Sequence, residues 1–317
     1  MGGLFGVIKG TETYLKTYLL TSKMKIIVTI PAYNEEKSIA RIIKEIKQAM
    51  DSRKYNYQVL VLDDGSKDHT AEVAKKSGAV VYSHPKNYGL AETFKTEMEK
   101  ALQMKADIIV HIDADGQYMP SEIPKLIDEV NKGNDLVLGS RFKGYIESMP
   151  LIKRLGNNAF SKVISQITKT HISDAQTGFR AFTKEVAKSI SITSRYTYTQ
   201  EQIIRAIKQK FKIKEIPVYF AKRNGKSRLV KNAFDYALKA WLTIIRIYRD
   251  HEPLKFFGVI GGIIFGAGFF LGLYLIYFQL FGEGIFRHFG LMILDVAILF
   301  TGLQLIMFAF LADMFRK

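Results

Sequence analysis

Two long apolar stretches near the carboxyl end constrain the fold of this chain most. Residues 256–281 contain no charged side chain, and residues 289–312 contain only Asp295. Each stretch exceeds the ~20 apolar residues that a helix needs to cross a bilayer. The alternative, two buried core helices, fits this length and position less well. We therefore predict a transmembrane hairpin with both of its ends on one side of the membrane.

The basic residues around this hairpin predict its orientation. They lie on both flanks: Arg246, Arg249 and Lys255 before it, and Arg316 and Lys317 after it. Lys and Arg are enriched on the cytoplasmic side of membrane segments. We therefore expect a protein of the cell membrane with two spans, whose main domain is cytoplasmic.

The net charge of +16 is unevenly distributed along the chain. Between residues 222 and 255, nine Lys and Arg residues stand against three acids. A basic segment directly before a membrane span suits anionic headgroups or a lipid phosphate. No zinc-finger or RNA-binding motif is present, so we expect no nucleic acid partner. The lack of cysteine excludes disulfides and thiolate chemistry.

From residue 25 to about residue 141, short apolar runs alternate with segments of helical spacing. The runs predict strands at 26–30, 59–62, 79–82, 108–112 and 136–138. The segments between them predict helices at 36–50, 68–77, 90–104 and 121–132. Such alternation predicts an α/β fold with a Rossmann-like, mostly parallel sheet, helices on both faces, and ligands at the carboxyl ends of the strands.

The pattern changes beyond residue 144. We predict a helix at 151–168, a loop at 174–180, a helix at 200–209, a strand at 213–220 and a helix at 229–248. The last helix is amphipathic, and it either lies in the membrane interface or packs on the sheet. The predicted domains are an N-terminal extension (1–23), in which we expect no cleaved signal peptide, a catalytic domain (24–228), a juxtamembrane helix (229–255) and the hairpin (256–317).

Acidic residues follow two of the predicted strands. Asp113 and Asp115 follow the run at 108–112, and Asp63 and Asp64 follow the run at 59–62. An Asp-x-Asp pair is common in surface loops, but at the carboxyl edge of a parallel sheet it can hold a divalent metal and a diphosphate. Asp63 and Asp64 would lie beside the first strand end, placed to accept hydrogen bonds from a base or ribose.

Several motifs occur in a family-specific order. They are Pro31-Ala32-Tyr33-Asn34-Glu35, Asp63-Asp64-Gly65-Ser66, Asp113-Ala114-Asp115 with Gln117, Gly139-Ser140-Arg141, Asp174-Ala175-Gln176-Thr177-Gly178-Phe179-Arg180, and Arg223-Asn224-Gly225-Lys226-Ser227-Arg228. With them, the chain resembles the family-2 glycosyltransferases of GT-A fold, and more narrowly the polyprenol-phosphate (dolichol-phosphate) mannose and glucose synthases. The resemblance covers about residues 25–228, and two C-terminal spans also occur in such enzymes.

The resemblance implies a role for each motif on the donor side. Contacts to the nucleotide sugar would come from Pro31, Tyr33, Glu35, Asp63, Asp64 and Asp113. Asp115 and Gln117, together with Asp113, would hold Mg²⁺ or Mn²⁺ through oxygen ligands. The metal would neutralise the charge that develops on the leaving nucleotide diphosphate.

The implied acceptor is a polyprenyl or dolichyl phosphate, which is already anionic and needs cations more than a strong base. The candidate cations are Arg141, Arg154, Arg223, Lys226 and Arg228, because arginine in particular offers bidentate geometry to phosphate. The predicted catalytic residues are Asp115, Asp174, Arg141 and Arg223. Asp174 either aligns the acceptor or the sugar hydroxyls, or caps a turn.

Two positions depart from the family pattern. Gly116 replaces a residue that is often bulky, and Arg228 replaces the usual lysine. Neither departure changes the predicted class of enzyme, but both make the sequence less informative about which sugar donor is preferred.

Within the hairpin, the glycine pairs 258/262, 262/266 and 268/272 indicate close helix contacts in the first span. Asp295 would be costly in lipid unless it faces protein, so it is expected to help pack the hairpin or a homo-oligomer.

We therefore expect an inverting, metal-dependent transferase. It would move one hexose from UDP-glucose or GDP-mannose to a polyprenyl phosphate at the cytoplasmic membrane face, producing a lipid-linked sugar for glycosylation. A processive polysaccharide synthase would carry a Gln-x-x-Arg-Trp motif, which the only tryptophan, Trp241, does not complete. A dinucleotide-dependent oxidoreductase would have Gly-x-Gly-x-x-Gly where residues 31–35 stand. A non-catalytic scaffold that binds nucleotide or lipid is the third alternative, and the intact acidic motif argues against it.

Overall fold

The computed structural model describes residues 24–192, 198–222, 233–282 and 288–315. The chain forms two compact units, residues 1–231 and 232–317. Of the predicted site residues, Arg223, Lys226 and Arg228 lie outside the described residues.

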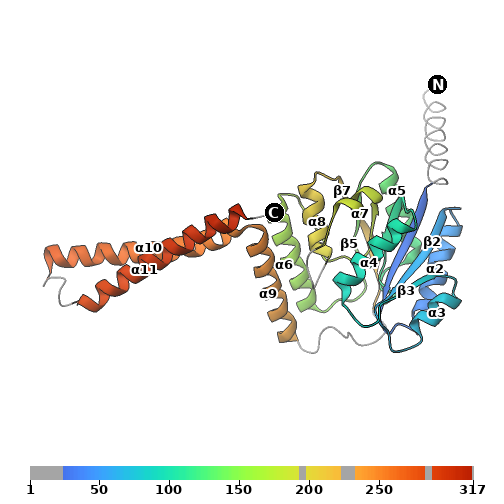
Figure 1. Ribbon diagram of the computed structural model, residues 1–317, viewed down its shortest axis with the longest axis horizontal. Helices are drawn as coiled ribbons and strands as arrows, with labels where there is room; N and C mark the ends of the chain where they lie inside the picture. Colours follow the sequence, from blue (N-terminus) through green and yellow to red (C-terminus); the bar gives the residue numbers. More distant parts are fainter. Residues whose placement is uncertain (1–23, 193–197, 223–232, 283–287, 316–317) are drawn as a thin grey trace, which may run out of the picture. The chain divides into compact units, whose positions relative to one another are not determined.

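The first unit (Figure 1) is built on a seven-stranded sheet, whose strands lie in the order β3-β2-β1-β4-β6-β5-β7. The strands are β1 (Lys25–Ala32), β2 (Asn56–Asp63), β3 (Val80–Ser83), β4 (Ile108–His111), β5 (Leu136–Ile146), β6 (Arg180–Thr183) and β7 (Ile213–Phe220). All neighbouring pairs are parallel except those of β6, which runs antiparallel to β4 and to β5. The predicted mostly parallel sheet is thus confirmed.

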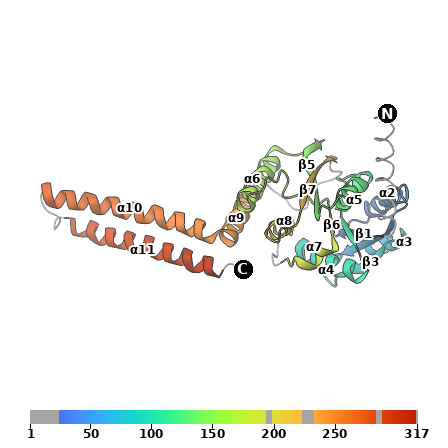
Figure 2. The ribbon, with the colours of Figure 1, turned by 90° about the horizontal axis from the view of Figure 1, so that it is seen from above.

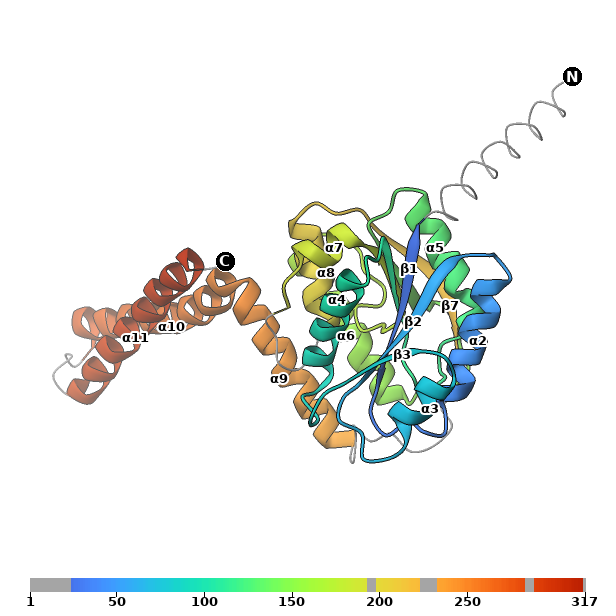
Figure 3. The same ribbon diagram turned by 45° about the vertical axis from the view of Figure 1, so that its right-hand side comes forward.

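Helices cover both faces of this sheet, with α2, α3 and α5 on one side and α4, α7 and α8 on the other (Figure 3). Their bounds, with those of α6 and the short η1, are α2 (Ile39–Asp51), α3 (Thr70–Lys76), α4 (Leu90–Gln103), η1 (Pro120–Glu122), α5 (Ile123–Asn131), α6 (Leu151–Thr168), α7 (Lys184–Ser189) and α8 (Thr199–Lys208). Because both faces are covered, the inner strands read as continuous apolar runs. In β1, Ile26, Val28 and Ile30 join the buried core that includes Ile42 and Ile46 of α2.

Three features of the first unit differ from the prediction. β5 extends to Ile146 instead of ending near residue 138. The short elements β6 and α7 were not predicted. β6 begins with a buried arginine, and α7 spans only six residues, so neither carries a long hydrophobic repeat.

The second unit contains α9 (Ala233–His251), α10 (Pro253–Phe281) and α11 (Phe289–Met314). α10 and α11 lie side by side along their length (Figure 2). Within the most apolar 18-residue segment of each helix, only 17% of α10 and 11% of α11 is buried. The core helices of a soluble domain are mostly buried. By length and composition both are candidate membrane spans.

Apart from Pro253 at the start of α10, the buried residues of α10 and α11 recur every seven positions: Gly261, Gly268 and Leu275 on α10, and Asp295, Gly302 and Ala309 on α11. This spacing is typical of a coiled-coil seam, and the glycines let the two backbones approach closely. A methyl group at Gly261 would lie 2.9 Å from the Ile306 nitrogen. Gly262 and Gly266 have no atom within 4 Å of such a methyl group, so this predicted pair does not contribute to the hairpin contact. Asp295 faces protein as expected, next to Gly272.

Candidate active site

The loops after β1 and β2 are joined by hydrogen bonds. The Asn34 nitrogen donates to Ser66 Oγ at 2.8 Å, and the Lys67 nitrogen donates to Asn34 Oδ1 at 2.7 Å. Farther along the same loops, the Glu35 nitrogen donates to Thr70 Oγ1 at 2.8 Å. Since β1 and β2 are parallel and adjacent, their carboxyl ends bring these loops together, as the sequence predicted.

Asp63 and Asp64 are both buried, but their partners differ. Asp63 accepts one hydrogen bond at Oδ1, from the Ser66 nitrogen at 3.1 Å. Asp64 binds the loop at residues 84–89 through both oxygens: His84 Nδ1 and the Tyr88 nitrogen contact Oδ1, and the Gly89 nitrogen donates to Oδ2 at 2.8 Å. Asp64 was predicted to contact the nucleotide sugar, and in the structure both of its carboxylate oxygens are hydrogen-bonded to this loop.

The acidic motif follows β4. The Gln117 nitrogen donates to Asp115 Oδ1 at 3.0 Å, and the Gln117 Nε2 donates to the Ala221 carbonyl at 3.1 Å. Among the described residues, Gln117 Oε1 has no hydrogen-bond donor. Burial and the negative charge of Asp115 raise the pKa of Asp113 to about 6. Two carboxylates that repel each other, with an amide oxygen two residues farther along the chain, form a donor set that fits Mg²⁺ or Mn²⁺.

No group of three or more His, Cys, Asp or Glu side chains suited to a metal occurs among the described residues. A cation held by Asp113, Asp115 and Gln117 would take its remaining oxygen ligands from water or from a bound substrate.

A buried polar cluster lies behind Asp113. His111 contacts Glu97 Oε2 through Nδ1 at 2.8 Å and the Tyr198 hydroxyl through Nε2 at 2.7 Å. Phe94 stacks on Tyr198, and the Arg180 guanidinium lies 5.1 Å from the centre of the same ring. Burial raises the pKa of Glu97. This cluster was not predicted, although His111 in an apolar run and Glu97 on the apolar face of a helix were a usable signal.

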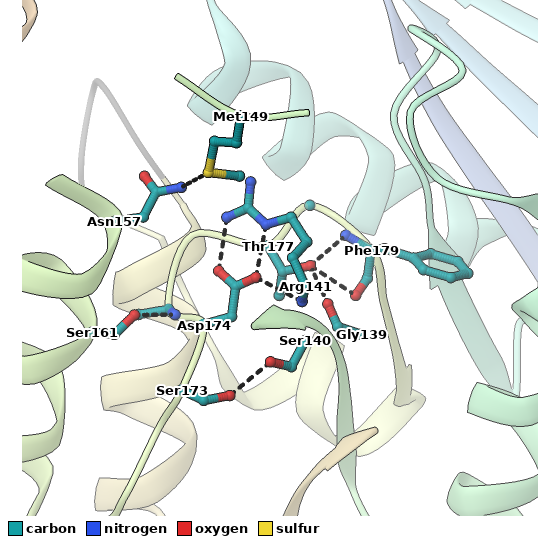
Figure 4. A network of polar contacts seen from close by, with 12 residues as sticks. Gly139, Ser140, Arg141, Met149, Asn157, Ser161, Ser173, Asp174, Thr177 and Phe179 are labelled. Carbon is teal, nitrogen blue, oxygen red and sulfur yellow. Dashed lines mark hydrogen bonds and ion pairs between the residues drawn. The ribbon is translucent and has the colours of Figure 1, made fainter. Parts of the chain in front are cut away.

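Arg141 and Asp174 form a buried ion pair (Figure 4). Arg141 Nε donates to Asp174 Oδ2 and Nη2 donates to Oδ1, both at 2.7 Å. The Arg141 backbone nitrogen also donates to Oδ2, at 3.0 Å. The pairing of β5 with β7 is irregular between Ser140 and Tyr145, which frees this backbone group for Asp174.

The ion pair with Arg141 bears on the predicted role of Asp174. The residue is 0% exposed, and both oxygens are occupied by Arg141. Two roles were predicted for Asp174, alignment of the acceptor and capping of a turn, and this geometry favours neither. It indicates instead that Asp174 orients the Arg141 side chain. Arg141 Nη1 remains without a hydrogen bond among the described residues.

The loop before β6 joins the two halves of the site. The Tyr118 hydroxyl contacts Thr177 Oγ1 and accepts from the Gly178 nitrogen, both at 3.2 Å. Thr177 Oγ1 in turn donates to the Gly139 carbonyl at 2.7 Å (Figure 4). The acidic motif, the Arg141 strand and the Asp174 loop therefore meet in one place.

The remaining predicted residues lie near the end of β1 and on α6. Pro31, Tyr33 and Glu35 are half-buried near the end of β1, on the same edge. Arg154 is exposed on α6, and no described contact brings it to Arg141.

An α/β sheet with an acidic pair after its fourth strand and a buried Arg–Asp pair beside it is an arrangement that suits a glycosyltransferase of GT-A type. The model of the family described as "Glycosyl transferase family 2" matches residues 27–191. The chain belongs to this family.

Relatives in archaea support this class. A UDP-N-acetylglucosamine–dolichyl-phosphate N-acetylglucosaminyltransferase of Methanococcus voltae is 33% identical over 61% of this chain and 84% of its own. A dolichyl-phosphate hexose transferase of Haloferax volcanii is 33% identical over 64% and 85%. A dolichol-phosphate mannosyltransferase of Pyrococcus furiosus is 30% identical over 78% and 71%.

A solved structure shares the fold. Glucosyl-3-phosphoglycerate synthase from Mycobacterium tuberculosis, in complex with Mn²⁺ and UDP-glucose, aligns with a TM-score of 0.57 at 21% identity, over 72% of this chain and 82% of that one.

Proposed function

We propose that this protein transfers a single hexose from a nucleotide-diphosphate sugar, such as UDP-glucose or GDP-mannose, to a polyprenyl or dolichyl phosphate. The observation that carries the proposal is the meeting of the acidic motif with the Arg141–Asp174 pair in a chain that also has two candidate membrane spans. The three archaeal relatives, which are named as dolichyl-phosphate or dolichol-phosphate transferases, support a lipid phosphate as the acceptor.

On the donor side, Asp63 would contact the base or ribose, since Oδ2 has no partner among the described residues. Pro31, Tyr33 and Glu35 would complete the nucleotide contacts, because they lie at the same sheet edge. Asp113, Asp115 and Gln117 would hold Mg²⁺ or Mn²⁺. When bound, the cation supplies Lewis-acid assistance to the departing nucleotide diphosphate.

On the acceptor side, Arg141 would position the lipid phosphate with Nη1, which has no hydrogen bond among the described residues, while Asp174 holds Nε and Nη2. A phosphate oxygen attacks the anomeric carbon, the bond from that carbon to the diphosphate breaks, and the configuration inverts. The acceptor arrives ionised, so no strong general base is required. Arg223, Lys226 and Arg228 stay candidates for further phosphate contacts, and the exposed Arg154 is a weaker one.

The proposed location is the cytoplasmic face of the membrane, with α10 and α11 as spans. The basic residues before α10 and after α11 support this orientation.

Transfer of label to lipid tests the proposal. Membranes that contain the full chain are incubated with polyprenyl phosphate and with one radiolabelled nucleotide sugar at a time. We expect lipid-extractable label from one donor, and loss of that label with a metal chelator or in Asp115→Ala. Asp51→Ala, which removes an exposed acid at the end of α2, serves as the control. Absence of lipid label from every donor would overturn the proposal.

A further inference from the structure

Glu215 is a buried acid on β7 that receives several donors from one short segment. Its carboxylate accepts hydrogen bonds from the Ser173 nitrogen at 2.9 and 3.1 Å, from Ser173 Oγ at 3.0 Å, and from the Asp174 nitrogen at 3.1 Å. Lys143 Nζ lies 2.8 Å from Oε2. Glu215 is 8% exposed, so these bonds form with little competition from water.

The segment that Glu215 holds is the one that orients Arg141. Residues 173 and 174 lie outside any helix or strand, so the ladders of the sheet do not fix their backbone. Glu215, by contrast, lies on a strand whose register with β5 is defined up to Ser140. A second tie, between Ser140 Oγ and Ser173 Oγ at 2.6 Å, links the segment to β5 directly (Figure 4).

We propose that Glu215 is a positioning residue, which fixes the Arg141 guanidinium through the Ser173–Asp174 backbone and touches no substrate itself. The role of Arg141 toward the acceptor rests on the proposed function. The order of contacts is Glu215 to the backbone of 173–174, Asp174 carboxylate to Arg141, and Arg141 to the acceptor phosphate.

The carboxylate is specifically suited to this task. Three groups donate hydrogen bonds to it, the Ser173 nitrogen, Ser173 Oγ and the Asp174 nitrogen. The Lys143 ammonium group balances its charge. A glutamine at this position would keep one acceptor oxygen but turn an NH₂ group toward N–H donors, and it would leave Lys143 without its counter-charge. Glu215→Gln thus preserves size and removes the anchor.

Chemical modification tests the geometry without enzyme activity. Phenylglyoxal reacts with accessible arginine side chains, and mass spectrometry of peptides gives the rate at each site. We expect the full chain with Glu215→Gln to be modified at Arg141 about tenfold faster than wild type, because local opening is easier. Arg154, which is exposed in both proteins, is the internal control. An unchanged rate at Arg141 would overturn the inference.

Kinetics test whether the anchoring serves the reaction. For Glu215→Gln we expect kcat to fall by about 10- to 100-fold, since small displacements of a positioning group have effects of this size. The Kd of the nucleotide sugar should change less than about twofold, because within the described chain the Glu215 carboxylate bonds only to residues 143, 173 and 174 and to none of the proposed donor contacts. Glu122→Gln is the matched control: it also removes a buried acid that holds β7, through the Tyr219 nitrogen at 2.8 Å, but it has no bond to the Asp174 segment.

A double mutant distinguishes positioning from general destabilisation. If Glu215 acts through Arg141, then adding Glu215→Gln to Arg141→Lys lowers the residual kcat by less than about twofold. Independent, multiplicative losses would contradict the inference. Wild-type transfer to lipid is measured in the same series. If wild type labels no lipid but Glu215→Gln still accelerates modification of Arg141, the proposed function fails and the positioning role stands.

Discussion

The Asp113 carboxylate lies against the backbone of Gly178, so closely that a methyl group at Gly178 would overlap Oδ2. Asp113 belongs to the acidic motif after β4, and Gly178 belongs to the loop that also carries Asp174. The glycine thus lets the loop that carries Asp174 pass directly over a carboxylate of the acidic motif. The missing side chain at position 178 is a requirement of the site and not of the backbone conformation.

Substitution of this glycine should impair metal binding. In Gly178→Ala the new methyl group displaces the Asp113 carboxylate, because the loop behind it is held by Tyr118. We expect Mn²⁺ affinity to fall by about tenfold, at the lower end of what displaced metal-site groups cost. Electron paramagnetic resonance of free Mn²⁺ measures the affinity. Gly262→Ala, at a glycine with open space around it, should have no effect, and equal affinities in all three proteins would refute the expectation.

Metal affinity should depend on pH near 6. Burial and the charge of Asp115 favour the protonated, neutral form of Asp113 and raise its pKa to about 6. A metal ligand must be ionised, so a proton has to leave below this pH before the cation binds. We expect Mn²⁺ affinity to be constant above about pH 7 and to fall by up to about tenfold per unit below pH 6. Asp113→Asn should bind more weakly and lose this dependence, whereas a flat wild-type profile between pH 5 and 7 would contradict it.

The neighbouring acids after β2 should behave differently when each is changed to its amide. Asp64→Asn loses a charged acceptor for the loop at 84–89, so we expect a loss of about 1–3 kcal/mol in the free energy of unfolding. Nucleotide affinity should change little. Asp63→Asn should instead weaken nucleotide binding by about tenfold or more. Denaturant unfolding measures the loss of stability, and calorimetry measures nucleotide binding. If Asp64→Asn weakened nucleotide binding and Asp63→Asn only lowered stability, the roles given to the two residues would be wrong.

Introduced cysteines should report the packing of α10 against α11. A Cβ atom at position 258 would lie 4.0 Å from the Ala309 Cβ, within the range of a disulfide. The natural chain contains no cysteine, so Gly258→Cys with Ala309→Cys offers one pairing only. We expect this double variant to crosslink within the chain under oxidation, as a mobility shift on a denaturing gel. Gly262→Cys with Ala309→Cys should not crosslink, since position 262 has open space around it.

Much of the fold could be predicted because its signals are local. Strands such as 26–30 and 108–112 are apolar and rich in branched side chains, and the polar residues after them marked the ligand edge. The antiparallel strand β6 carried no such signal: its first residue, Arg180, is charged, and it is buried only because Gln202 and backbone carbonyls of Thr177 and Thr199 accept its hydrogens. That arrangement depends on distant parts of the chain.

The site shows the same division. The types and order of the residues predicted that Asp113, Asp115 and Arg141 lie at one edge of the sheet. They did not predict which residues these three contact. Nothing local distinguishes Asp63 from Asp64, since the difference lies in the direction of each side chain toward or away from residue 84. Glu215 was missed because an acid in a short strand is usually exposed, and its donors lie about 40 residues earlier in the sequence.

The order of the strands sets the order in which this enzyme can be completed during synthesis. β1 to β4 pair with one another, and all four precede residue 112. β5 has β6 and β7 as its neighbours, so it waits for residues up to 220 to leave the ribosome. Since a domain folds as a unit while the chain is synthesised, Arg141 cannot gain its partners Asp174 and Glu215 until β7 has been made. The Arg141–Asp174 pair is therefore the last part of the candidate site that can form.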